Sequence, residues 1–218
     1  MDIIRDSLDL IGNTPLLLVK NLDTGPCNLY LKLESFNLGG SIKDRPAKNM
    51  IIEAENKGLL KKGGTIVEAT AGNTGIALAI MAVKRGYKVV IIVPDKMTIE
   101  KVYHLKALGA EVIVARSDVV NGHPEYYLEI AKRIAKERKA FYINQFSNQA
   151  NIKSHIKDLG PELYKQLNGK IHAFVAGVGT GGTISGIGKF LKSKNKKCEL
   201  VLADPKGSIL KDLIKTGK

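Results

Sequence analysis

Three glycine-rich loops contain the residues of this sequence that are best suited to bind an anion. They span residues 39–46, 70–75 and 177–183, and each precedes a segment that is expected to be helical. Glycines let backbone N–H groups converge on one point, and the N-terminus of a helix adds about half a positive charge. Because the second and third loops also follow expected strands, the sequence predicts sites for two anions.

The third loop also matches a nucleotide-binding pattern. Gly177, Gly179 and Gly182 form a G-x-G-x-x-G sequence after an expected strand, and Asp204 closes the next strand. This context is typical of a loop that binds a dinucleotide, so the loop alone favours a nicotinamide or flavin cofactor. The alternative is a glycine-rich turn between a strand and a helix that binds nothing.

Lys43 favours a different cofactor. A lone lysine near the start of a helix is usually a solvated surface charge, but Lys43 follows a Gly-Gly-Ser turn. The helix dipole disfavours a cation there and lowers the pKa of the amine, and a neutral amine can form a Schiff base. An aldehyde cofactor with a phosphate would use such an amine together with a phosphate-binding loop. The carboxylate of an amino-acid substrate would be the second anion.

The elements that must position these loops alternate along the chain. Short apolar runs predict strands at residues 65–69, 89–94, 110–115, 141–146, 172–178 and 199–203. Segments with a helical period predict helices at residues 75–85, 98–108, 124–138, 151–167 and 183–192, and another that starts near Lys43. This alternation is typical of an α/β protein with parallel sheets. The first forty residues differ, because they predict an antiparallel hairpin at residues 16–19 and 28–34.

Composition excludes several classes of function. The 218 residues carry a net charge of +13 with 44% hydrophobic and 25% charged residues, as in ordinary globular proteins. Most of the excess positive charge lies after residue 100. Because the sequence has no Trp and no nucleic-acid-binding module, a surface of solvated lysines is favoured over weak binding of polyanions. Two distant cysteines predict neither a disulfide framework nor a metal site. No apolar run predicts a membrane helix, and the N-terminal sequence lacks a secretory signal, so a cytoplasmic protein is expected.

Five motifs in register resemble the cysteine synthase and cystathionine β-synthase family of pyridoxal-phosphate enzymes, which have fold type II. They lie at residues 11–16, 39–46, 70–75, 145–146 and 179–183. The resemblance implies an α/β fold of two three-layer αβα domains with mainly parallel sheets. Residues 48–149 would form the small N-terminal domain. Residues 1–47 plus 150–218 would form the larger cofactor-binding domain, truncated at its C-terminus by about a third of the family's catalytic core.

The resemblance also implies a role for each motif residue. Lys43 would be the Schiff-base lysine and would move the proton at the substrate Cα, and Asn73 would bind the ring hydroxyl oxygen of the cofactor. The phosphate would be bound by Gly179, Thr180, Gly181, Gly182 and Thr183. The substrate carboxylate would be bound by Thr70, Ala71, Gly72, Asn73, Thr74 and Gln145. Ala71 stands where the family commonly has Ser, which removes one hydrogen bond worth about 1.5–3 kcal/mol.

The implied reaction is a β-replacement that uses pyridoxal 5'-phosphate. Serine or O-acetylserine would be converted to cysteine with sulfide as the thiol co-substrate, or to cystathionine with homocysteine, and the motifs leave both outcomes open. A homodimer without nucleic-acid or membrane partners is implied. Two alternatives remain at this point: a catalytically impaired, truncated remnant that acts as a binding partner, and a dinucleotide-binding Rossmann protein. No residue can be assigned the family's contact with the pyridine nitrogen.

Overall fold

The computed structural model describes residues 3–217. By its internal contacts the chain forms two units, one extending to Ala150 and the other beginning at Asn151. The contacts group residues before position 48 with the first unit, whereas the sequence assigned residues 1–47 to the cofactor-binding domain. That domain assignment stays a prediction.

A parallel sheet of four strands forms the centre of the first unit. In spatial order it contains β5 (Glu111–Ala115), β4 (Lys88–Pro94), β3 (Thr65–Ala69) and β6 (Phe141–Tyr142). All three neighbouring pairs are parallel. The buried runs of β3 and β4 are rich in Val and Ile, as expected for strands that are covered on both faces. The structure therefore confirms the predicted α/β class and the parallel sheet.

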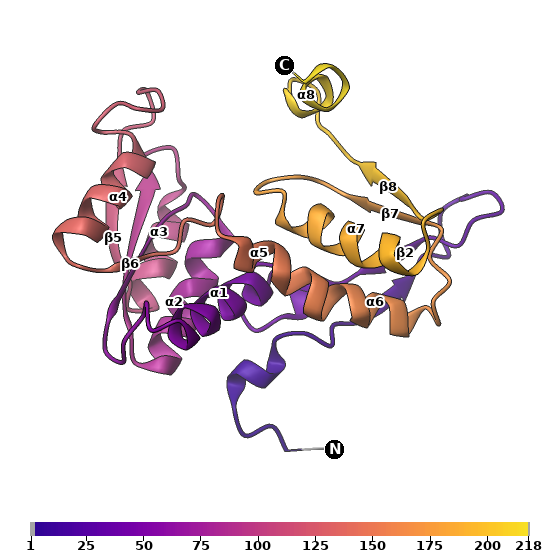
Figure 1. Cartoon of the computed structure of the whole chain (residues 1–218), viewed down its shortest axis with the longest axis horizontal. Coiled ribbons are helices and arrows are strands. Elements are labelled where there is room, and N and C mark those ends of the chain that lie inside the picture. Colours follow the sequence, from indigo (N-terminus) through magenta and orange to yellow (C-terminus); the bar gives the residue numbers. More distant parts are fainter. Residues whose placement is uncertain (1–2, 218) are drawn as a thin grey trace. The chain divides into compact units, whose positions relative to one another are not determined.

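Helices cover both faces of this sheet, as Figure 1 shows. They are α1 (Asp44–Asn56), α2 (Asn73–Arg85), α3 (Ile99–Ala107) and α4 (Tyr127–Glu137). Alternate strand residues face opposite sides, so Ile66 packs in a core with α1, α2 and α3, whereas Val67 packs with α4. Helix α2 starts two residues earlier than predicted, which places Asn73 and Thr74 in its first turn.

The strand predicted at residues 141–146 is shorter in the structure. It ends at Tyr142, because Asn144 has a left-handed backbone with φ of 51° and turns the chain away from the sheet. This turn brings Gln145 back toward the end of β3, where its backbone N–H donates to a side-chain oxygen of Glu68. The predicted strand boundary is therefore wrong in the segment that positions Gln145, a predicted site residue.

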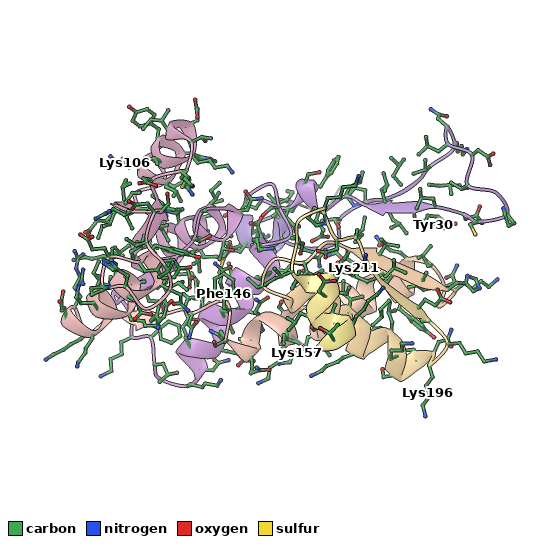
Figure 2. All side chains as sticks on the ribbon, turned by 90° about the horizontal axis from the view of Figure 1, so that it is seen from above. Tyr30, Lys106, Phe146, Lys157, Lys196 and Lys211 are labelled. Atoms are coloured by element: carbon green, nitrogen blue, oxygen red, sulfur yellow. The ribbon has the colours of Figure 1, made fainter. Side chains whose placement is uncertain are left out.

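The predicted hairpin near the N-terminus is confirmed. Strands β1 (Leu16–Leu18) and β2 (Tyr30–Lys32) pair antiparallel, with Leu17 opposite Leu31. The hairpin is flanked by two short 3₁₀ turns, η1 (Ser7–Leu10) and η2 (Glu34–Phe36). Its apolar side chains are largely exposed, and Tyr30 projects from the strand (Figure 2).

The second unit contains a small parallel sheet joined by a helix. Its elements are α6 (Gly160–Gln166), β7 (Ala173–Ala176), α7 (Gly182–Lys194), β8 (Glu199–Leu202) and α8 (Leu210–Thr216). Strands β7 and β8 pair parallel, and α7 connects them (Figure 1). The helix predicted over residues 151–167 is interrupted, because a π-helical turn, η3 (His155–Leu159), lies between α5 (Gln149–Ser154) and α6.

Lysines cover much of the surface of the second unit. Lys157, Lys196 and Lys211 are all exposed, and Figure 2 shows their side chains extending from the ribbon. This distribution agrees with the solvated lysine surface that the sequence favours. Among residues 3–217, no helix combines the length and the apolar character that crossing a membrane requires.

Hydrogen exchange is expected to be slower in the first sheet than in the second. Val67 and Ile91 at the centre of the four-stranded sheet are fully buried, whereas Val175 of β7 and Val201 of β8 are 57% and 40% exposed. Local opening therefore exposes less new apolar surface in the two-stranded sheet and requires less free energy. Amide hydrogen exchange followed by mass spectrometry on the 218-residue chain measures protection in both sheets. Equal protection of β3 and β7 amides in a monodisperse monomer would contradict this expectation.

Candidate active site

Lys43 lies at the start of α1, as the sequence predicts. It is the residue before the first helical position, and its backbone N–H donates to Ser41 Oγ at 3.2 Å. Its side chain is half-buried, and among residues 3–217 its ammonium has no hydrogen-bond or ion-pair partner. Burial lowers the pKa of the Lys43 amine. The predicted direction is therefore right, and desolvation of the buried amine is its cause.

Asp44 holds the glycine turn that precedes Lys43. Its Oδ2 accepts a hydrogen bond from the Gly39 backbone N–H, and burial raises the pKa of the Asp44 carboxyl to about 6. Residue 39 has no room for a side chain, because a Cβ there would lie 2.6 Å from Asp44 Oδ1. A larger residue at position 39 would therefore push against the carboxyl that holds the turn.

A buried ion pair anchors the other side of the first turn of α1. The Arg45 side chain has no exposed surface, and its Nε and Nη2 donate to Glu34 at 2.7 and 2.8 Å. Glu34 also accepts from Thr14 Oγ1 at 2.6 Å and from Asn37 Nδ2 at 2.9 Å. Burial alone would raise the pKa of Glu34, but these hydrogen bonds and the Arg45 charge outweigh it and lower that pKa. The network fixes the helix that carries Lys43.

The second predicted loop follows β3 and contacts Gln145. Thr70 Oγ1 accepts from the Gly72 N–H at 3.1 Å, and Thr74 Oγ1 donates to Gln145 Oε1 at 2.7 Å. The structure therefore brings together Thr74 and Gln145, which lie 71 positions apart in the sequence. Ala71 and Asn73 are exposed, so this part of the loop faces solvent.

Glu68 is a buried carboxyl beside this loop that the sequence interpretation missed. It has no exposed surface, and its Oε2 accepts from the Gln145 N–H at 3.3 Å. Burial raises the pKa of Glu68 to about 8, although hydrogen bonds from the Gln145 and Ala69 backbones oppose the shift. An acid within the otherwise apolar strand sequence TIVEA was the signal that could have identified it.

The third loop forms a glycine-rich turn at the start of α7. Gly181 has a left-handed φ of 81°, and the space beside the α-carbons of Gly179 and Gly181 is open. Thr180 Oγ1 accepts from the Gly182 N–H at 3.4 Å, so the loop presents backbone amides together with threonine hydroxyls. These groups are donors that suit a phosphate.

Two buried side chains that sequence reasoning missed support the threonines of this loop. Asn151 Nδ2 donates to Thr180 Oγ1 at 2.9 Å, and His155 Nε2 lies 3.3 Å from Thr183 Oγ1. Both are polar residues buried on one helix at a spacing of four, which is the pattern that could have revealed them. Asp204 instead accepts from the Lys211 N–H at 3.0 Å, a contact between the β8–α8 connection and the first turn of α8.

Replacing Gly186 by alanine is expected to destabilise the second unit. A Cβ at this position of α7 would lie 2.5 Å from the Ile152 carbonyl oxygen, and backbone cannot give way cheaply. Overpacking of this kind typically costs about 1–3 kcal/mol, occasionally more. Gly188→Ala in the same helix is the matched control, because its Cβ would meet only the flexible end of Leu200. Urea denaturation of both variants compares them, and equal midpoints would contradict the expectation.

Each unit, taken by itself, contains groups whose chemistry suits a phosphate-bearing aldehyde cofactor. Lys43 offers an unpaired amine whose pKa is lowered by burial, and the 179–183 loop offers amides and hydroxyls around open space. In the described part of the chain, no cluster of His, Cys, Asp and Glu could hold a metal ion.

Residues 8–218 match the family model described as "Pyridoxal-phosphate dependent enzyme". The chain belongs to this family. The match confirms the resemblance, the fold class and the cofactor that the sequence predicts.

Similar proteins come from several organisms. The chain is 45% identical over 212 residues to "Cystathionine beta-synthase" of Apis mellifera, covering 95% of this chain and 42% of the relative. It is 43% identical over 212 residues to "Cysteine synthase" of Dictyostelium discoideum, covering 96% and 56%. The crystal structure of a hydrogen sulfide-producing enzyme from Fusobacterium nucleatum superposes with a TM-score of 0.90 at 40% identity, covering 99% and 70%.

The chain thus spans about half the length of the two curated relatives and about two thirds of the solved structure. The similarity extends over the α/β elements and all three loops, because it covers nearly the whole of this pyridoxal-phosphate family member. It favours neither the dinucleotide-binding protein nor the binding-partner remnant. The roles of the individual site residues stay predictions.

Proposed function

We propose that this chain carries the catalytic residues of a β-replacement enzyme acting on serine or O-acetylserine. The observation that carries the proposal is the half-buried, unpaired amine of Lys43 in a chain of the pyridoxal-phosphate family. Relatives named cystathionine beta-synthase and cysteine synthase support this class of reaction. The products are cysteine when sulfide is the thiol and cystathionine when homocysteine is the thiol.

Lys43 has two tasks in this proposal. Its Nζ would hold the cofactor covalently, and once the substrate amine has displaced it, the freed Lys43 amine would take and return the proton at the substrate Cα. Burial keeps a larger fraction of the amine neutral at a given pH, and only the neutral amine can act as nucleophile or base. When bound, the cofactor supplies the electron sink for the charge that develops at Cα. Asp44 and Arg45 hold the turn and helix that orient the amine.

The loop after β3 binds the substrate carboxylate. The N–H groups of Ala71, Asn73 and Thr74 are the proposed donors, together with the Thr70 hydroxyl and the Gln145 side-chain amide. The Thr70 and Gly72 N–H groups donate to the Ile92 carbonyl oxygen and to Thr70 Oγ1, so these two residues shape the loop. Thr74 Oγ1 donates to Gln145 Oε1, so Nε2 is the donor group of that amide, and one of its two hydrogens points to the Ala69 carbonyl oxygen at 3.4 Å. Asn73 is exposed at the first turn of α2 and is proposed to bind the cofactor's ring hydroxyl oxygen. Ala71 contributes only its backbone.

Borohydride reduction tests this proposal. The 218-residue chain is incubated with pyridoxal 5'-phosphate, reduced and digested, and the labelled peptide is identified by mass spectrometry. The label is expected on Lys43. A label on Lys48 or Lys32, whose amines already donate to the carbonyl oxygens of Leu8 and Thr14, would refute the assignment. Product analysis with serine or O-acetylserine, combined with sulfide or homocysteine, separates the two reactions.

The 179–183 loop is expected to bind phosphate rather than a dinucleotide, despite its G-x-G-x-x-G sequence. It offers the hydroxyls of Thr180 and Thr183 in addition to its amides, and Asp204 already accepts from the Lys211 N–H. Calorimetric titration should therefore detect pyridoxal 5'-phosphate and no binding of NAD at the same concentration. Tighter binding of NAD than of pyridoxal 5'-phosphate would restore the dinucleotide interpretation.

We also propose that the protein acts as a homodimer in the cytoplasm, as the resemblance implies. Its other partners are then the amino-acid substrate and the thiol co-substrate. Light scattering during size-exclusion chromatography measures the molar mass and distinguishes a dimer from a monomer.

A further inference from the structure

Glu68 holds the chain segment that carries the proposed carboxylate ligand Gln145. The carboxyl lies in β3, two residues before the 70–75 loop, and its Oε2 accepts from the Gln145 N–H at 3.3 Å. The Gln145 side chain in turn contacts Thr74 Oγ1 at 2.7 Å and the Ala69 carbonyl oxygen at 3.4 Å. Glu68 therefore acts on both ends of this contact: on the loop through β3 and on Gln145 through its backbone.

The surroundings of Glu68 disfavour its ionised form. Its side chain has no exposed surface, and Oε1 accepts no hydrogen bond from the described residues. The titratable groups that interact with it are Tyr142 of β6 and Tyr127 of α4, and the Glu68 charge contributes to raising the pKa of each. Neither phenol supplies a positive charge. A buried carboxyl without a cationic partner takes up a proton in preference to ionising.

An ionised Glu68 would also oppose the substrate. The substrate carboxylate is proposed to bind the Gln145 amide and the loop that directly follows β3. An ionised Glu68 carboxylate, which contacts Gln145 from the other side, would repel it. The repulsion is strong because the intervening groups are buried and little water screens it. A neutral Glu68 keeps the hydrogen bond from Gln145 and adds no charge.

We propose that Glu68 is a positioning residue of the carboxylate subsite, which orients Gln145 and must be neutral for the amino-acid substrate to bind. This inference rests on the proposed function, because it takes the 70–75 loop and Gln145 as the ligands of the substrate carboxylate. It adds a group that does not touch the substrate but controls its affinity through charge.

The pH dependence of serine binding tests the proposal. The dissociation constant of L-serine is measured from the visible spectrum of the cofactor-loaded chain between pH 7 and pH 9.5, for wild type and for Glu68→Gln. The amine of serine and Lys43 titrate in both proteins, so the ratio of the two constants isolates Glu68. Burial raises the pKa of Glu68 to about 8. Above that pH, the dissociation constant of wild type should rise relative to that of Glu68→Gln by about tenfold per pH unit. A purely structural role predicts a constant ratio.

Glu129→Gln is the matched control. Glu129 is a partly exposed carboxylate that pairs with Lys132 and interacts with Tyr142 from α4, so its removal changes charge in the same region without touching Gln145. Its serine affinity should follow the wild-type pH profile. If Glu68→Gln follows that profile as well, the proposal is wrong.

A second measurement does not depend on the cofactor. Because the pKa of Glu68 is raised in the folded protein, its neutral form contributes stability that is fully present below pH 4.5 and lost as pH rises through about 8. The urea midpoint of wild type should therefore fall relative to Glu68→Gln between pH 5 and pH 8. Parallel midpoints would overturn the proposal even if the chain binds no cofactor. Absence of any visible cofactor band in wild type refutes the proposed function instead.

Discussion

Replacing Lys43 by alanine will abolish covalent cofactor binding while the fold is retained. The change removes the only amine that the 39–46 motif places at the start of α1. It should also leave stability unchanged or slightly higher, because burial of the unpaired Lys43 ammonium lowers its pKa and is therefore unfavourable for the folded protein. Visible absorbance after addition of pyridoxal 5'-phosphate measures the first effect, and circular dichroism with urea denaturation measures the second.

Lys48→Ala is the control for this experiment. Lys48 lies five residues further along the same helix, and its Nζ donates to the Leu8 carbonyl oxygen at 3.0 Å. Its removal should retain the visible band. If Lys43→Ala keeps the band and Lys48→Ala loses it, the attachment site is Lys48 and the interpretation of the 39–46 motif is wrong.

Breaking the buried pair between Arg45 and Glu34 is expected to destabilise the protein more than any surface change. Arg45→Met leaves Glu34 as a largely buried carboxylate, with only its hydrogen bonds from Thr14 and Asn37. Removing one partner of a buried ion pair typically costs about 3–5 kcal/mol. Urea denaturation of the single variants and of Arg45→Met/Glu34→Leu measures the coupling. The double variant should lose less stability than the two single changes add up to.

A matched surface pair provides the comparison. Arg138 donates to both carboxylate oxygens of Glu111 at 2.6 and 2.8 Å, so its geometry resembles that of the buried pair, but both side chains are about half exposed. Arg138→Met should cost no more than about 1 kcal/mol, as is usual for exposed pairs. Equal losses for Arg45→Met and Arg138→Met would show that burial does not determine the strength of the Arg45 pair.

Local sequence patterns predicted the elements that are defined by local physics. The apolar runs of β3 and β4, the glycine turns and the position of Lys43 before α1 all depend on neighbouring residues, and the structure confirms them. The hairpin pairing also follows from two runs separated by a short loop. The α/β class required only that these patterns alternate.

Contacts between distant residues could not be predicted in the same way. The hydrogen bond from Thr74 to Gln145 depends on the left-handed turn at Asn144. Asn favours such turns, but a single Asn in this run is too weak a signal to predict that the strand ends at Tyr142. The pairing of Arg45 with Glu34 needs the turn between them to fold back. The cause of the lowered Lys43 pKa depends on burial, which is a property of the packed structure rather than of sequence position.

The π-helical turn of the second unit sets the alignment of two helices. Along α7 the contact positions Gly182, Gly186 and Phe190 are four residues apart, whereas their counterparts Asn151, His155 and Gly160 are four and then five apart. The wide turn absorbs the extra residue. Adding a second extra residue between His155 and Gly160, beyond the one that the wide turn accommodates, would rotate the preceding segment by about 100° against α7. Thr180 and Thr183 would then lose their contacts with Asn151 and His155. The glycine-rich loop before α7 therefore depends on the number of residues in this helical segment.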